Sequence, residues 1–280
     1  MGEGNRRCFF CGSVGPLTRE HAIARWIGDV LEDLEPGQDR PKWGVHYTAG
    51  GLIERDRQHL VAEASVVVRG VCRTCNGGWM ASLEGRVKPW MTRMIRGERV
   101  ALDVPQQIDL AAWASKTVVT LEFQEPTTVI ARPEDRELIR LEGRPPHHHV
   151  VRVAHRNDYQ EALLLHAQVA RSEDAPDEGP DAFGVLMGLG HLLVQVWGGH
   201  GADTGEPLRR YGTKIGNALM VWPPVPTNVE WPPAVSIGDE SFDAFAREVL
   251  PWRTDSPALA AWRASRQEDI AARDRFQPRD

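Results

Sequence analysis

Apolar residues recur at helical spacing in several parts of the chain. Between residues 23 and 34 they fall three or four positions apart, and Pro36 and Gly37 follow, so we predict a helix that ends there. Similar spacing after Asn76 predicts a second helix, which Pro89 should bend or end. Further helices are predicted at 108–123, 242–250 and 258–276.

Runs rich in β-branched and apolar residues predict the strands, at 64–70, 149–154, 183–197 and 218–222. Three stretches lack such runs: residues 36–59 are predicted to be a long loop, 172–181 an acidic loop, and 223–233 an extended connector. This mixture predicts an α+β fold. We expect a small module over residues 1–100 and a larger α+β region of unknown role over residues 101–280.

The four cysteines form two Cys-x-x-Cys pairs, Cys8 with Cys11 and Cys72 with Cys75. Each short loop places two thiolates on one side of a turn, and two such loops complete a tetrahedral site for a structural zinc ion. Zinc would join segments 60 residues apart and contribute on the order of 10 kcal/mol to folding. Disulfides are the alternative, but a Cys-x-x-Cys loop is short for a structural bridge.

Charge is distributed unevenly along the chain. The net charge is −6, yet residues 1–100 hold 15 Lys and Arg against 12 Asp and Glu, a balance of +3, while residues 101–280 have a balance of −9. The first part therefore permits phosphate contacts, and the acidic part favours a protein partner or a regulatory role. The polar start and the lack of any apolar run of 18 residues favour neither a signal peptide nor a membrane span, and reduced cysteines suit the cytoplasm.

Three motifs follow one another in the first part of the chain: Cys8-Phe-Phe-Cys11-Gly12, then Glu20-His21 followed by Trp26, then Cys72-Arg-Thr-Cys75-Asn76-Gly-Gly-Trp79 followed by Leu83-Glu84. This order of motifs resembles the zinc-knuckle branch of the HNH endonuclease family. The resemblance covers about the first 95 residues and is closest to bacterial proteins that share these signatures.

The resemblance implies a ββα unit that holds one divalent metal ion against a DNA phosphodiester. His21 would be the general base that activates water, Glu20 a ligand of the metal, and Asn76 the ligand at the start of the helix. Carboxylate and amide oxygens suit Mg²⁺ or Mn²⁺, so a catalytic cation is expected besides the structural zinc. Three features depart from the family: Ala24 replaces a proline, the middle asparagine has no counterpart at 66–71, and the spacer before the second cysteine pair is long.

Other interpretations of these residues remain open. Glu20 and His21 could be surface residues at the start of a helix, and Asn76 could be a helix N-cap. The run His147-His148-His149 attracts attention, but adjacent histidines near a strand point to opposite faces and rarely converge on a metal. His191 is expected to be a buried, hydrogen-bonded histidine, and the loop residue His200 carries no clear signal. Glu84 and Arg25 are candidates for phosphate or supporting contacts.

The sequence therefore favours a metal-dependent endonuclease that hydrolyses DNA phosphodiester bonds. One alternative is a non-catalytic zinc-knuckle module whose acidic C-terminal region binds a protein. Another is an HNH-like site that acts on a small molecule.

Overall fold

The computed structural model describes most of the chain, and the fold is a mixture of helices and sheets, as the α+β prediction requires. The described residues are 6–34, 43–48, 59–61, 67–123, 129–157, 163–170, 180–200, 218–238, 241–242 and 245. None of the helices in these ranges has the length and apolar character needed to cross a bilayer.

A seven-stranded sheet forms the centre of the fold, with strand order β10-β6-β9-β8-β7-β2-β3. The pairs are antiparallel except for β2 with β7, which run parallel. The strands are β2 (Trp43–Thr48), β3 (His59–Val61), β6 (Val150–His155), β7 (Leu163–Ala170), β8 (Pro180–Leu189), β9 (Leu192–Gly199) and β10 (Ala218–Trp222).

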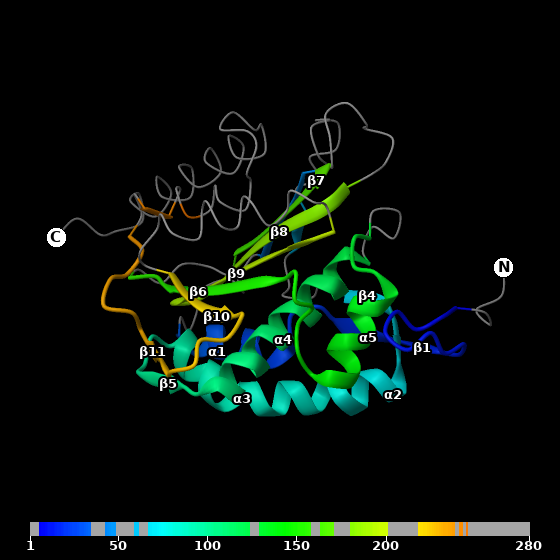
Figure 1. Cartoon of the computed structure of the whole chain (residues 1–280), viewed down its shortest axis with the longest axis horizontal. Coiled ribbons are helices and arrows are strands. Elements are labelled where there is room, and N and C mark those ends of the chain that lie inside the picture. The colour runs from blue at the N-terminus through cyan, green and yellow to red at the C-terminus, as the bar shows by residue number, and fades with distance from the viewer. Residues whose placement is uncertain are drawn as a thin grey trace.

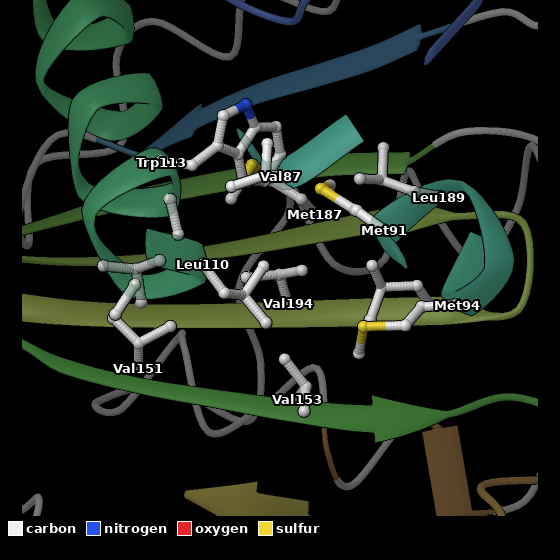
Figure 2. Packing of buried hydrophobic residues seen from close by; sticks show 14 of the residues in the cluster. Val87, Met91, Met94, Leu110, Trp113, Val151, Val153, Met187, Leu189 and Val194 are labelled. Atoms are coloured by element: carbon white, nitrogen blue, oxygen red, sulfur yellow. The ribbon is translucent and has the colours of Figure 1, made fainter. Parts of the chain in front are cut away.

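The central strands contribute apolar side chains to a core on each face of the sheet. Side chains alternate between faces along a strand, and Val151 and Val153 of β6 join the large core while Ala154 joins a smaller one. Figure 2 shows the large core, in which Val153 packs near Met94 and other side chains from two helices. The smaller core on the opposite face includes Leu186, Leu193, Phe242 and Phe245.

Helices α1 (Arg25–Leu34), α3 (Ala81–Ile95) and α4 (Val104–Glu122) lie on one side of the sheet (Figure 1). A capping box begins α4: Asp103 accepts from the Gln106 N–H at 2.8 Å, and Gln106 accepts from the Asp103 N–H at 3.0 Å. Because α4 is surrounded by α3, the sheet and α5 (Pro133–Glu142), every residue of α4 from Leu110 to Glu122 is buried. Pro89 lies inside α3 and does not end it.

Two short ladders lie apart from the main sheet. Strand β1 (Leu17–His21) pairs with β4 (Val67–Cys72), and β5 (Val100–Leu102) pairs with β11 (Val229–Trp231), both antiparallel. After β4 the chain enters a short helix α2 (Arg73–Cys75) and a wide turn η2 (Asn76–Met80), which lead into α3. The β1–β4 ladder and the start of this helical segment bring together the residues that the sequence singled out.

Several predictions of elements are confirmed and others are wrong. The helices at 23–34 and 108–123 are present as α1 and α4, and the strand at 218–222 is present as β10. The run 183–197 is not one strand but most of the β8–β9 hairpin, which turns at Gly190, where φ is +60°. The predicted loop at 36–59 contains β2, and the predicted connector at 223–233 contains β11.

Some predictions fall outside the described residues or remain untested. The predicted acidic loop at 172–181 is described only at its end, where β8 begins. The predicted closing helix at 242–250 is described only at Phe242 and Phe245, and the one at 258–276 lies outside the described residues. The division at residue 100 remains a prediction. The large core contains side chains from both sides of that position, among them Ile27 and Met91 on one side and Trp113 and Val194 on the other.

Candidate metal centre and the adjacent carboxylate–histidine site

The four cysteines meet in a cluster that could hold a metal ion. Their Sγ atoms all lie within 4.8 Å of one another, and Cys11 Sγ is 3.6 Å from Cys72 Sγ. All four thiols are free. A tetrahedral site with sulfur at about 2.3 Å from the metal has sulfur–sulfur edges of about 3.8 Å, so the observed spacing fits a shared cation rather than a disulfide.

Local backbone geometry brings the first pair into position. Residues 8–12 form a tight turn in which Gly12, at φ +68°, donates its N–H to the Cys8 carbonyl at 2.9 Å. The Phe9 N–H donates to the Gly70 carbonyl at 2.8 Å, and the Phe9 ring covers Gly70 so closely that a Cβ there would lie 1.6 Å from it. Glycine at position 70 is thus required for this turn to dock on β4.

The second pair is placed by the end of β4 and by α2. The Cys72 N–H points at Cys8 Sγ, 3.3 Å away, and Cys75 follows one helical turn later. Burial raises the pKa of the Cys8 and Cys75 thiols above its ordinary value. Holding these sulfurs as thiolates therefore requires a positive charge among them, which a metal ion provides.

Glu20 and His21 lie at the end of β1 and not in a helix, so their interpretation as helix-start residues is wrong. The ladder register places Glu20 opposite Val68 and His21 opposite Val67. Adjacent residues of a strand point to opposite faces, and here Glu20 is buried while His21 is half-buried. The chain then passes through Ala22, Ile23 and Ala24, all buried in the large core, into α1.

Lys116 of α4 lies between two carboxylates. Its Nζ is 2.9 Å from Oε1 of Glu84 on α3 and 3.7 Å from Oε1 of Glu20 on β1. The Lys116 side chain is fully buried, and those of Glu20 and Glu84 are 8% and 23% exposed. Burial raises the pKa of Glu20, as does the charge of Glu84, while Lys116 acts against both. The three groups form one charge network around the buried Lys116 ammonium.

His21 lies within electrostatic range of the same network. Its pKa is lowered by burial and by the charge of Arg25, and Glu84 opposes this. The imidazole is therefore neutral near pH 7, the form that can accept a proton. Its Nδ1 atom is buried and makes no hydrogen bond within the described part of the chain. No described residue therefore takes the place, as a partner of Nδ1, of the middle asparagine that this sequence lacks.

Asn76 is fixed to the β1–β4 ladder. Its Nδ2 donates to Thr18 Oγ1 at 2.9 Å, and the Thr18 hydroxyl donates to the Val71 carbonyl at 2.8 Å. The side chain thus does not act as an N-cap of α3, whose N-cap position is Met80. The hydrogen bond to Thr18 uses the Asn76 amide nitrogen. The amide oxygen, the atom that would bind a cation, is not used in this hydrogen bond.

Lys116 was not predicted to be a site residue, although one signal for it exists. It is the only charged residue between Asp109 and Glu122 in an otherwise apolar helix. A lone lysine in such a position indicates a buried partner of opposite charge but does not identify it. Glu84 was predicted only as a supporting residue, and the structure places it against Lys116 and within electrostatic range of His21.

Within the described ranges, two groups of three or more His, Cys, Asp or Glu residues come within 4.8 Å of one another: the four cysteines, and Asp135 with His148 and His200. Glu20, His21 and Glu84 are not such a group. A scan against models of protein families, a search of curated proteins and a search of solved structures each found no match to this chain.

Proposed function

We propose that this chain is a metal-dependent phosphodiesterase of the HNH endonuclease type that hydrolyses DNA. The observation that supports it most strongly is the position of the Glu20–His21 pair. The pair ends a two-stranded ladder whose other strand carries Cys72, and a helix beginning at the cysteine cluster brings Glu84 beside it. This order of strand, strand and helix is the one that the resemblance implies.

A structural zinc ion on Cys8, Cys11, Cys72 and Cys75 is part of the proposal. Four thiolates are a soft ligand set that favours zinc over the hard cations. With four protein ligands the site has no open position for substrate, so its role is to hold the Cys8–Cys11 turn against β4 and α2. The cluster packs on Phe10, Met80, Val119 and Ile139 in a small core of its own.

His21 is the general base in this proposal. Burial lowers its pKa, which keeps the imidazole neutral and able to take a proton from an attacking water molecule. Lys116 contacts Oε1 of both Glu20 and Glu84 and so holds the two carboxylates in place. The positive charge of Lys116 also limits the repulsion between them.

Glu20, Glu84 and Asn76 would hold the catalytic Mg²⁺ or Mn²⁺. Their donor atoms are oxygens, which these cations prefer, and each carboxylate has a second oxygen besides the one that faces Lys116. When bound, such a cation stabilises the negative charge that develops on the phosphate. The donor types thus fit the cation, although Lys116 competes for the same carboxylates.

Arginines around the site suit a nucleic-acid substrate. Residues 6–25 and 67–76 contain six arginines and one acidic residue, the buried Glu20. All six arginines are exposed, and Arg19 lies directly opposite Arg69 in the ladder. Like charges in opposed positions destabilise a ladder, so an anion that bridges them is favourable. A DNA phosphate is an anion of that kind.

Plasmid nicking in Mg²⁺ or Mn²⁺ tests the proposal. We expect the wild type to nick DNA and His21→Ala to reduce the rate by about 10²-fold or more, because a general base contributes that much. His147→Ala removes an exposed histidine elsewhere and is the matched control. Glu20→Ala, Glu84→Ala or Asn76→Ala should instead raise the cation concentration that the reaction needs. Equal rates in wild type and His21→Ala would refute the proposal.

A non-catalytic zinc module is the second candidate, and the Lys116 network favours it. A fully buried ammonium between Glu20 and Glu84 already neutralises part of the charge that would attract a divalent cation. In that case the metal cluster remains necessary for folding, but no preparation of the wild-type protein cleaves DNA in any divalent cation. The acidic region beyond residue 100 would then be the surface for a protein partner.

A further inference from the structure

We propose that Asp135, His148 and His200 form a second metal site, which binds a first-row divalent transition metal such as Zn²⁺ independently of the four cysteines. The three residues come from separate parts of the fold. Asp135 is in the first turn of α5, His148 precedes β6, and His200 follows β9. Their ligand atoms all lie within 4.8 Å of one another.

The distances between the ligand atoms are close to those in a coordination site. Small movements of the side chains would therefore bring all three onto one metal ion. His148 Nε2 is 3.6 Å from Asp135 Oδ1, and His200 Nε2 is 2.8 Å from Asp135 Oδ2. The two imidazole ring centroids are 4.4 Å apart. In a tetrahedral site with ligands at about 2.0–2.1 Å, neighbouring ligand atoms are about 3.3–3.4 Å apart. Both histidines present the same ring atom, Nε2, to one carboxylate.

Asp135 is held in position by the start of α5. Its Oδ2 accepts the Arg132 N–H at 2.9 Å, and its side chain is only 9% exposed. A metal bound through Oδ1 would leave this backbone hydrogen bond intact. Supporting hydrogen bonds of this type orient the ligands of metal sites in proteins.

The neighbours of His148 fix the direction of its side chain. His149 is fully buried, and its Nδ1 lies 3.0 Å from the Ser115 hydroxyl on α4, while His147 is exposed. The three adjacent histidines lie in the turn before β6 and not on a strand, and the ring centroids of His147 and His149 are 5.5 and 5.0 Å from that of His148, so the prediction that they point to opposite faces is wrong. Convergence arises instead between His148 and two residues distant in sequence, which the spacing of the histidines could not indicate.

The ligand set selects the kind of metal. Two imidazoles and one carboxylate suit Zn²⁺ and Fe²⁺, and they suit neither Mg²⁺, which prefers oxygen, nor Cu⁺, which prefers sulfur. Three protein ligands leave a further position for water or another ligand. His148 and His200 are 18% and 15% exposed, so a metal can reach the site from solvent.

Cobalt binding by the full-length protein tests this inference, because Co²⁺ substitutes for zinc and reports its ligands. Cobalt on the cysteines gives a thiolate charge-transfer band, and cobalt on the histidines does not. We expect the wild type and the control His147→Ala to bind one Co²⁺ per chain that adds nothing to that band. His148→Ala and His200→Ala should bind this ion at least about 100-fold more weakly.

Two results of the cobalt titration would overturn the inference. One is a wild-type protein whose bound Co²⁺ is all associated with the thiolate band. The other is unchanged binding in both His148→Ala and His200→Ala. Thermal melts of each variant show whether it is folded, and X-ray absorption of the wild type with Zn²⁺ gives an independent readout, expected to show nitrogen and oxygen neighbours besides sulfur. Only sulfur neighbours at full zinc occupancy would equally count against the site.

Discussion

The fully buried Lys116 of α4 forms an ion pair with the half-buried Glu84 of α3, with 2.9 Å between Nζ and Oε1. Glu20 of β1 lies on the same ammonium group at 3.7 Å, so one cation connects the β1–β4 ladder to two core helices. The position of Glu20 and, through it, that of the neighbouring His21 depend on this contact. The candidate catalytic pair is therefore supported from the core and not only by its own ladder.

Replacing Lys116 with Met should destabilise the protein by about 3–5 kcal/mol, because the buried Glu20 and the half-buried Glu84 lose the ammonium group that lies between them. Urea unfolding of Lys116→Met and wild type would measure this change. Lys88→Met alters an exposed lysine on α3 and should change the free energy of unfolding by less than about 0.5 kcal/mol. If both variants behave alike, the network contributes little to stability.

Gly70→Ala should disrupt the docking of the Cys8–Cys11 turn, because the new Cβ would lie 1.6 Å from the Phe9 ring. Displacing the ring should lower the free energy of unfolding by about 1–3 kcal/mol. The metal affinity of the cysteine cluster should fall as well. Gly77→Ala is the matched control, since a Cβ added at Gly77 would meet no atom within 4 Å. Adding Phe9→Ala to Gly70→Ala should restore part of the lost metal affinity; no restoration would mean that the ring is not the obstacle.

Removing one thiolate should remove the metal and the cooperative unfolding transition together. Cys72→Ser is expected to lose its tightly bound zinc and to melt without a single sharp transition, because metal binding here is part of the folding free energy. Thr74→Ser changes an exposed residue between the two cysteines and should leave both properties unchanged. Zinc analysis and calorimetry would check this, and an unaltered melt in Cys72→Ser would contradict a structural role.

The buried carboxyl group of Glu122 should make the stability of the protein depend on pH. Burial raises the pKa of this carboxyl to about 8, against the opposing effect of the Ala131 N–H, which donates to Oε2 at 3.0 Å. Above the unfolded pKa the folded protein binds more protons than the unfolded chain, so stability should fall as pH rises from about 4.5 to about 8. Glu122→Gln should reduce this fall. Denaturant unfolding across that range would measure it, and identical slopes in both proteins would contradict the assignment.

The parts of the fold that the sequence predicted are those with a strong local pattern. The α1 periodicity and the Cys-x-x-Cys spacing each depend on residues that are close together in the sequence. The helix is present as α1, and the four cysteines form a cluster that could hold a metal ion. Helix α5 was missed although Pro133 and the acidic residues that follow it are signals for a helix start. The β8–β9 turn at Gly190 was missed because apolar residues continue on both sides of it.

The site residues that were missed depend on contacts between distant parts of the chain. Nothing local to Lys116 indicates that Glu84 and Glu20 face it from two other elements. In the same way, His200 lies in a Gly-rich segment, and only the path of β9 brings it to Asp135. Spacing along the chain can identify ligands within one turn, but it cannot pair side chains that the tertiary fold brings together.

The rate of plasmid nicking as a function of pH, compared between wild type and His21→Ala, tests the proposed nuclease most directly. Burial and Arg25 lower the pKa of His21, so the wild-type rate should rise with pH, and the midpoint of this rise should lie below the ordinary histidine pKa of about 6.5. His21→Ala should be slower by about 10²-fold or more at neutral pH and should lack this rise. A His21→Ala protein with the rate and the pH profile of the wild type would contradict the account.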